Sequence, residues 1–479
     1  MHSGFAVLLG IAVLACVFGG EISAYAEDEA EDDSLCGPFD QPYQIARANS
    51  APATHDPATH EEGVVSPSDD VEGTIRPGSI VELVEPAPAA DFGLSPKGSE
   101  ALLALPKNAA GALPTDFKLG PGARISESFF SPVLCATLAR VTGPAGATLD
   151  RLVTVVPEGS TVVPNDIYRS AAGEIQPISE SSNRVRPKSI PDPYVPLQYG
   201  LAISGVRAAR ELSAGAGVKI ALLDSAPDIE HRDLPGMRIE PLDGSTAEPK
   251  PGVHGTLMAG VISAVEGNGF GIVGLAPDAE LISIPVCTPA GAAGGSCTIF
   301  DLLQGLDLAW EVEADLVNLS LSGPANALLE RGVMRLEALG VVVVAAAGNE
   351  GVDEERYPAA YPSVIGVGAV DREGRLFEAS NRGDWVELLA PGVEILSTVP
   401  GNAFAFGSGT SLAAAHVTGQ LAVLTAAIGN PKAARAELFR EASSPRTKQK
   451  TSLRSLPPVC DVFSRIELSC GEAADGSSR

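Results

Sequence analysis

The stretch "GSGTSLAAAHVTGQLAVLTAA", residues 407–427, joins a glycine-rich turn to a long apolar run that contains Ser411 and His416. A run of this length could suggest a membrane span, but His416, Thr418 and Gln420 interrupt it, which favours a core helix. A helix turns about 100° per residue, so the side chains of Ser411 and His416 would lie about 140° apart around the axis. The stretch therefore predicts a core helix, with Ser411 at or just before its start and His416 in a structural role.

The sequence around this helix, from residue 192 to about 445, alternates between the patterns of buried strands and of helices. Continuous apolar runs such as "VKIALLD", "DLVNLSLS" and "VVVVAAAGN" are separated by stretches with a helical period, such as "DLLQGLDLAWEV". This alternation predicts an α/β fold built on a doubly wound, mostly parallel sheet. Ligands of such sheets bind in the loops at the carboxyl ends of the strands.

Four polar residues fall at positions where chemistry is expected in such a fold. They are Asp224, His254, Asn349 and Ser411. Taken alone, Asp224 could cap a turn and His254 could be a hydrogen-bonded core histidine. Their combination favours a functional reading, because Gly407 and Gly409 allow tight turns before Ser411 and the exposed N–H groups at the helix start favour a developing oxyanion.

The blocks "LLDSAPDIEHRDL", "HGTLMAG", "NLSLSGP", "AAAGNEG" and "GTSLAAAHVTG" are similar, in order and spacing, to those of the subtilisin-like serine proteases, over roughly residues 194–460. The resemblance implies a catalytic triad in the chain order Asp, His, Ser. Ser411 would be the nucleophile, His254 the general base and then acid, and Asp224 the carboxylate that orients the imidazole. The side-chain amide of Asn349 and the backbone N–H of Ser411 would stabilise the oxyanion.

The resemblance also implies where a substrate lies. The segment "SLSGP" would form one edge of a peptide-binding cleft and "AAAG" one wall of its primary pocket, while residues 287–297 would form the other edge, stiffened by a disulfide. The residues expected to contact the substrate are Ser320, Leu321, Ser322, Gly323, Ala346, Ala347 and Gly348.

The chain departs from the family at several positions. Ala226 and Ala415 replace a usual Gly and Pro, and Ala226 would cost about 1 kcal/mol if its position required a positive φ. Asp233 and Asn268 match a region where many members bind structural calcium, but Val195 stands where the family has a glutamine ligand. No cofactor is expected for the chemistry, and structural calcium remains an open alternative.

The amino-terminal part of the chain predicts export and a precursor. Residues 1–26 combine an apolar stretch with an Ala-Tyr-Ala cleavage site, which favours a secreted or periplasmic protein over a lipoprotein anchored at Cys16. The segment "DRLVTVVPEGSTVVPNDIYR" resembles the last strand region of the family's inhibitory propeptide, although a plain accessory domain is the alternative. The expected divisions are a signal peptide (1–26), an acidic, Pro-rich disordered segment (27–75), a small propeptide-like α+β unit (76–169), a linker with the processing site between Arg169 and Tyr194 (170–191), the catalytic domain (192–470) and a disordered tail (471–479).

Cysteine content and net charge restrict the partners. Removal of the signal peptide leaves six cysteines, and the simplest scheme pairs Cys287 with Cys297 and Cys460 with Cys470, which leaves Cys36 to pair with Cys135. The formal net charge of −27 argues against nucleic acid as a partner.

The sequence thus predicts an exported serine endopeptidase, made as a precursor and hydrolysing peptide bonds through an acyl-enzyme. We expect a monomer that acts on protein or peptide substrates, is inhibited by its own propeptide and has no membrane span in the mature chain. The alternative is a catalytically silent relative that keeps the fold as a peptide-binding module. A fluorophosphonate probe discriminates between the two.

Overall fold

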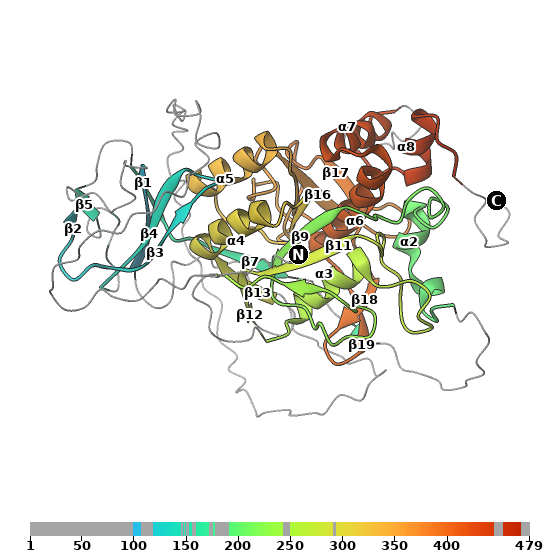
Figure 1. Ribbon diagram of the computed structural model, residues 1–479, viewed down its shortest axis with the longest axis horizontal. Helices are drawn as coiled ribbons and strands as arrows, with labels where there is room; N and C mark the ends of the chain where they lie inside the picture. The colour runs from blue at the N-terminus through green and yellow to red at the C-terminus, as the bar shows by residue number, and fades with distance from the viewer. Residues whose placement is uncertain are drawn as a thin grey trace, which may run out of the picture. The chain divides into compact units, whose positions relative to one another are not determined.

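A seven-stranded parallel sheet spans residues 219–391 of the computed structural model, which confirms the predicted α/β fold (Figure 1). In spatial order its strands are β10 (Arg238–Ile239), β11 (Glu280–Pro285), β9 (Lys219–Asp224), β14 (Leu316–Leu319), β15 (Val342–Ala346), β16 (Val364–Val370) and β17 (Leu388–Pro391). The structure describes residues 99–106, 118–144, 147, 149, 153–155, 160–171, 176–177, 191–242, 250–290, 294–444 and 454–470.

Alternate residues of each strand contribute to two hydrophobic cores, one on each face of the sheet. In β9, Ile220 and Leu222 contribute to one core, whereas Ala221 and Leu223 contribute to the other. The first core is covered by α3 (Val253–Ser263) and α6 (Thr410–Ile428), and the second by α4 (Ile299–Glu311) and α5 (Ala327–Ala338). Burial on both faces explains the uninterrupted apolar runs of the strands. The remaining helices are a 3₁₀ turn (Val195–Leu197), α2 (Tyr199–Ser204), α7 (Pro431–Ala442) and α8 (Val459–Arg465).

The strand order changes direction between β9 and β14. From β9 the chain forms β11 and β10 on one side of that strand, and then returns to form β14 on the other side. Asp224 is the last residue of β9, and Ser320 directly follows β14. Both residues therefore lie at the carboxyl edge of the sheet at the topological switch point, where open α/β sheets bind their ligands.

Two small antiparallel sheets each take one strand from the segment before residue 180. One contains β12 (Cys287–Ala290), β13 (Gly294–Thr298) and β7 (Ile167–Ala171). The other contains β18 (Ile395–Val399), β19 (Ala403–Gly407) and β8 (Gln176–Pro177). The end of β7 and all of β8 fall within the predicted linker 170–191, so parts of that segment are paired with the larger domain.

The amino-terminal unit presents one face of a four-stranded antiparallel sheet to the larger domain. Its strands are β3 (Arg124–Ser131), β4 (Ala136–Gly143), β1 (Ser99–Pro106) and β6 (Thr161–Pro164), beside the short pair β2 (Lys118–Leu119) and β5 (Val153–Val155). Leu103 and Val141 belong to a core within the unit, whereas Leu102 and Leu138 join the core that contains α4 and α5. The segments predicted at 1–26, 27–75 and 471–479 lie outside the described residues.

Helix α6 is the predicted core helix. Within the described ranges it is the one helix long and apolar enough to cross a membrane, and most of it is buried inside the protein. Disulfides join Cys287 to Cys297 and Cys460 to Cys470, as predicted. Cys36 lies outside the described residues, so its pairing with Cys135 stays a prediction.

Candidate active site

The carboxylate of Asp224 and the imidazole of His254 form a buried hydrogen-bonded pair. Nδ1 of His254 lies 2.8 Å from both carboxylate oxygens of Asp224, and each residue is 1% exposed. The backbone N–H of Ser225 donates to Asp224 Oδ1 at 2.6 Å, and the Ser225 hydroxyl donates to the same atom at 3.2 Å. These donors stabilise a carboxylate that would be costly to bury alone. The pair fixes the ring so that Nε2 points away from Asp224.

Glycines allow helix α3 to approach the end of β9 and so bring His254 to Asp224. A Cβ atom on Gly255 would overlap the carbonyl oxygen of Ser225, and one on Gly252 would overlap the Ser225 side chain. Gly255 instead donates its N–H to the Ser225 hydroxyl at 3.0 Å. The "GVHG" sequence is therefore a packing requirement of the site as well as a helix start.

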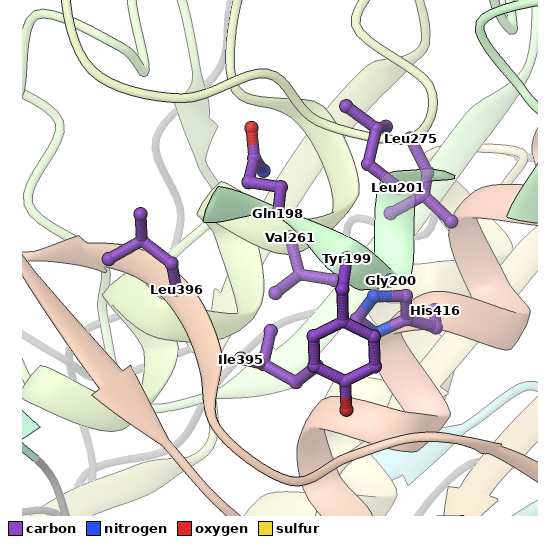
Figure 2. A pocket seen from close by; sticks show the side chains of 9 residues that line it. All are labelled: Gln198, Tyr199, Gly200, Leu201, Val261, Leu275, Ile395, Leu396 and His416. Carbon is purple, nitrogen blue, oxygen red and sulfur yellow. The ribbon is translucent and has the colours of Figure 1, made fainter. Parts of the chain in front are cut away.

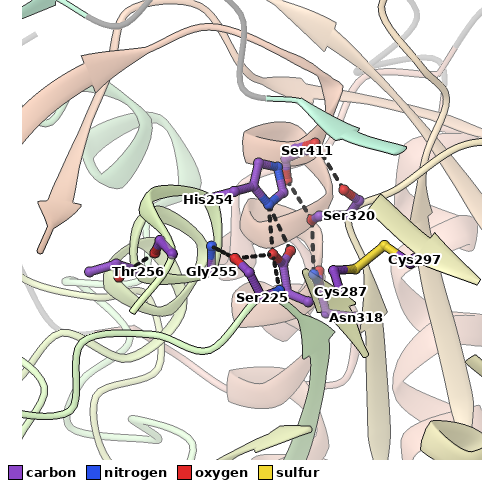
Figure 3. A network of polar contacts seen from close by, with 11 residues as sticks. Ser225, His254, Gly255, Thr256, Cys287, Cys297, Asn318, Ser320 and Ser411 are labelled. Carbon is purple, nitrogen blue, oxygen red and sulfur yellow. Dashed lines mark hydrogen bonds and ion pairs between the residues drawn. A yellow bond between two sulfur atoms is a disulfide. The ribbon is translucent and has the colours of Figure 1, made fainter. Parts of the chain in front are cut away.

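Ser411 is the second residue of α6, so its N–H is among the first four helical N–H groups, which have no intrahelical acceptor. Its hydroxyl donates to the carbonyl of Ser320 at 3.2 Å, and the Ser320 hydroxyl donates to the carbonyl of Ser411 at 3.0 Å. Figure 3 shows the His254 ring beside the Ser411 side chain. Nε2 of His254 makes no hydrogen bond to another described residue. Such a gap between base and nucleophile is common before a substrate tightens the site.

Asn349 is held against the start of α6 by its side-chain oxygen. Its Oδ1 accepts from the Thr410 N–H at 2.9 Å and from the Thr410 hydroxyl at 3.1 Å. The Thr410 hydroxyl in turn accepts from the Gly348 N–H at 3.0 Å. Because the oxygen of the amide is fixed by Thr410, its nitrogen occupies the opposite position and can donate.

Strand β7 lies between two chain segments that were predicted as the edges of the substrate cleft. On one side Arg169 pairs with Ser296 of β13. On the other, Arg169 and Ser322 exchange two backbone hydrogen bonds of 3.0 Å. Continuing this antiparallel register by two residues places Ala171 opposite Ser320, the residue whose carbonyl accepts from the Ser411 hydroxyl.

The predicted wall of the primary pocket is closely packed. Ala346 and Ala347 are buried, and Gly348 has a φ of 99°. A Cβ on Gly348 would lie 2.5 Å from Nδ2 of Asn381 and 3.1 Å from the hydroxyl of Ser322. The hydroxyl of Ser322 therefore lies close to the backbone of Gly348.

The chain matches the model of the Subtilase family over residues 215–455, which is half of its length. The chain belongs to the subtilase family. This similarity makes it a subtilisin-like serine endopeptidase by family. The matched residues include all four predicted catalytic positions and exclude strands β1–β7.

Three proteins illustrate the similarity of this subtilase to known members. It is 38% identical over 236 residues to the thermophilic serine proteinase of Bacillus sp. (strain AK1), covering 48% of this chain and 58% of the relative. It is 37% identical to the intracellular serine protease of Paenibacillus polymyxa, covering 51% of this chain and 75% of the relative. A solved protease from Pseudoalteromonas arctica matches with a TM-score of 0.50 and 22% identity, covering 58% of this chain and 99% of that one, which shows a shared fold.

The predicted calcium ligands of this subtilase face N–H donors. Oδ1 of Asp233 accepts from Nδ2 of Asn268 at 2.8 Å, and Oδ2 accepts from the N–H of Ile272 at 2.9 Å. Burial raises the pKa of the Asp233 carboxyl to about 7, and these hydrogen bonds offset only part of the rise. Asp192, which the sequence did not suggest, accepts from the N–H groups of Gly267 and Gly269 in the same loop. A site lined by N–H groups does not fit calcium, which requires six to eight oxygens.

His416 lies apart from the triad, as the helical geometry predicted. Its Nδ1 lies 2.8 Å from the Leu412 carbonyl, and full burial lowers its pKa to about 4. Figure 2 shows the ring beside Gly200, in a pocket also lined by Tyr199 and Val261. A Cβ on Gly200 would overlap the ring, so the histidine is a packing element of the subtilase core.

Two further findings concern Ala226 and Tyr168. Ala226 is not among the described non-glycine residues that have a positive φ. The strain that a positive φ would have caused there does not arise. Tyr168, which the sequence did not single out, is fully buried between the amino-terminal unit and the cleft. No local signal marks it, because its burial depends on the register of β7.

Proposed function

We propose that the chain is an exported serine endopeptidase that hydrolyses peptide bonds of proteins or peptides through an acyl-enzyme, and that it is made as a self-inhibited precursor. The observation that carries this proposal is the arrangement of Asp224, His254 and Ser411 at the carboxyl edge of the sheet. Three residues far apart in the sequence supply a carboxylate, a buried imidazole held by it, and a hydroxyl at a helix start.

In the proposed reaction, the Ser411 hydroxyl attacks the carbonyl carbon of the scissile bond and passes its proton to Nε2 of His254. Asp224 stabilises the imidazolium that forms, because its carboxylate already lies 2.8 Å from Nδ1. The imidazolium then donates the proton to the leaving amine, which releases the first product and leaves an ester on Ser411. A water molecule, deprotonated by the same nitrogen, hydrolyses the ester and restores the hydroxyl.

The oxyanion formed in both steps would accept from Nδ2 of Asn349 and from the N–H of Ser411. The amide of Asn349 is preorganised because Thr410 holds its oxygen, so little rearrangement is required as charge develops. In subtilisin, loss of the equivalent side-chain donor lowers kcat on the order of a hundredfold to a thousandfold. Each proposed step uses a group of the chain itself.

The amino-terminal unit would inhibit the precursor by occupying the cleft with β7. Its backbone pairs on both sides as an extended substrate would, and its register places Ala171 opposite Ser320, beside the nucleophile. We propose that the enzyme cuts its own chain at the bond between Ala171 and Ala172. This bond lies within the region from Arg169 to Tyr194 that was predicted for processing.

Export is supported by the signal-like residues 1–26 and by the disulfides Cys287–Cys297 and Cys460–Cys470. Structural disulfides are typical of proteins that fold in oxidising compartments. Because one similar relative is named as intracellular, family membership alone does not settle the compartment. We propose a secreted or periplasmic location for the processed chain, which would act as a monomer.

A fluorophosphonate probe tests the proposed chemistry. The processed protein should be labelled on Ser411 and should cleave casein, and Ser411→Ala should do neither while keeping the same circular dichroism spectrum. Sequencing the amino terminus of the processed chain tests the cleavage position. If processed protein fails to react with the probe, the chain is a silent peptide-binding relative and the proposed activity is wrong.

A further inference from the structure

We infer that the substrate cleft selects tyrosine over phenylalanine at the fourth residue before the scissile bond, by accepting a hydrogen bond from the tyrosine hydroxyl. The inference rests on the proposed function, because it treats β7 as bound in the manner of a substrate. It adds a substrate preference that depends on one atom, the hydroxyl oxygen by which tyrosine differs from phenylalanine.

The register of β7 defines this position. If the scissile bond follows Ala171, then Tyr168 is the fourth residue before it. In the strand, Tyr168 pairs with Cys297 of β13, and the neighbouring Arg169 pairs with Ser322 on the other side. A substrate that adds the same strand between the same edges would direct its fourth residue into the same place, because side-chain direction alternates along a strand.

The residues that contact the ring and the hydroxyl of Tyr168, Gly323 and Pro324, belong to the protease domain. The side chain is fully buried, and Gly323 lies against its ring. A Cβ on Gly323 would come 2.5 Å from Cδ1 of the ring, so the glycine makes the space that the ring fills. Because Gly323 and Pro324 belong to the protease, both contacts stay available to a substrate after the amino-terminal unit leaves.

The hydroxyl of Tyr168 donates to the carbonyl oxygen of Pro324. The hydroxyl of Tyr361 also interacts with the Tyr168 hydroxyl, and it donates to the Asn326 carbonyl at 2.9 Å and accepts from the Asn326 N–H at 2.8 Å. Burial raises the pKa of the Tyr168 hydroxyl well above its ordinary value, so it stays a donor. The Pro324 carbonyl is a backbone group whose position is set by the fold, and it is therefore a fixed acceptor for a substrate hydroxyl.

A preference for tyrosine over phenylalanine distinguishes this subsite from a purely apolar pocket. Phenylalanine is the more hydrophobic residue, so a pocket that only buries a ring would bind it at least as well as tyrosine. Loss of one hydrogen bond lowers affinity roughly threefold to tenfold, and more if the acceptor is left without a partner. We therefore expect the processed enzyme to cleave a tyrosine substrate about tenfold faster than its phenylalanine analogue in kcat/KM.

The test uses the processed enzyme and two fluorescence-quenched peptides. The first spans Ile-Tyr-Arg-Ser-Ala-Ala-Gly, the sequence of residues 167–173, and the second has phenylalanine in place of tyrosine. Two control peptides keep the tyrosine that corresponds to Tyr168. They replace the next residue, the arginine that corresponds to the exposed Arg169, with tyrosine in one peptide and with phenylalanine in the other. The first pair should differ about tenfold in kcat/KM and the control pair should not differ.

Two measurements on the protein extend the test. The variant Gly323→Ala should lose activity toward the tyrosine peptide and abolish the difference within the first pair, because its added methyl group enters the ring space. The precursor variant Tyr168→Phe should process itself more slowly than the unmodified precursor. The peptide comparison needs neither variant to fold.

Each outcome bears on a separate claim. Equal rates within the first pair, or faster cleavage of the phenylalanine peptide, would overturn the inference and leave the protease assignment intact. A tyrosine preference that also appears in the control pair would overturn it as well, because the preference would not belong to this position. Failure to cleave any peptide together with failure to react with fluorophosphonate would overturn both the inference and the proposed function.

Discussion

The buried carboxyl of Asp307 should make the affinity of the amino-terminal unit for the protease depend on pH. Asp307 lies in α4 and is 5% exposed. Its Oδ1 accepts from the Ser131 hydroxyl at 2.9 Å and from the Val133 N–H at 3.0 Å, both in the amino-terminal unit. Its Oδ2 has no hydrogen-bond partner among the described residues. Departure of the unit removes both donors and exposes this carboxyl to water.

The direction and size of the effect follow from the two states of Asp307. Burial raises the pKa of the Asp307 carboxyl in the complex to about 7, from an ordinary value of 3.8. Asp307 therefore binds a proton more tightly in the complex than in the separated protease. Protonation of Asp307 stabilises the complex fully below about pH 4, and this contribution is lost as the pH rises through about 7. Between these two pH values, each pH unit raises the dissociation constant of the amino-terminal unit about tenfold. This constant should therefore rise roughly tenfold to a hundredfold from pH 5 to pH 8.

The assay dilutes the self-cleaved complex and measures the recovery of peptidase activity at several pH values. Activity is normalised to fully dissociated enzyme at the same pH, which removes the pH dependence of catalysis itself. The matched control is Asp307→Asn, which stays neutral and should show a much weaker pH dependence. Burial also raises the pKa of Asp166 and of Asp301, so some dependence of the same sign should remain. Identical pH profiles for the two proteins would refute the reasoning.

Three further outcomes are expected. Asn349→Ala should lower kcat about a hundredfold or more with little change in KM, because it removes a donor needed in the transition state; an unchanged kcat in steady-state kinetics would contradict this. The double variant Cys287→Ser with Cys297→Ser should raise KM and lower the free energy of unfolding by about 2–3 kcal/mol, measured by peptide kinetics and urea titration; an unchanged KM would show that the disulfide does not stiffen the cleft edge. Addition of EDTA should leave Tm unchanged, because Asp233 faces N–H donors; a fall in Tm on chelation would show a bound cation that these contacts do not explain.

The fold was predictable because its signals are local. The apolar run of β9 and the run before Asn349 have lengths and flanks that identify buried strands, and both strands lie in the sheet as expected. Parallel strands end at one edge, so the order of the elements was enough to place Asp224 and Asn349 at the same edge. The two short disulfides were predictable for the same reason, since each closes a loop of nearby residues.

The contacts of the amino-terminal unit could not be predicted from the sequence. Ser131 and Asp307 are 176 positions apart, and nothing in either local pattern marks them as partners. Tyr168 reads as an ordinary aromatic residue of a strand until the register of β7 places it against Gly323. Asp233 shows the converse limit: its position suggested a cation, and only the direction of the surrounding N–H groups shows that the site does not suit one.

The short segment that leads into β7 explains why cutting the chain need not release the unit. Asn165 accepts from the N–H of Phe300 at the start of α4, and Asp166 accepts from Nδ2 of Asn326, the residue that caps α5. These contacts and the pairing of β7 all precede the proposed cleavage site, so hydrolysis after Ala171 leaves them intact. Inhibition would then end only when the noncovalent contacts weaken.

Among the described groups of this interface, Asp307 is the one whose pKa is raised to about 7. Its contacts should therefore change most in strength between mildly acidic and mildly alkaline conditions. Hydrolysis and release would thus be separate steps, controlled by different residues.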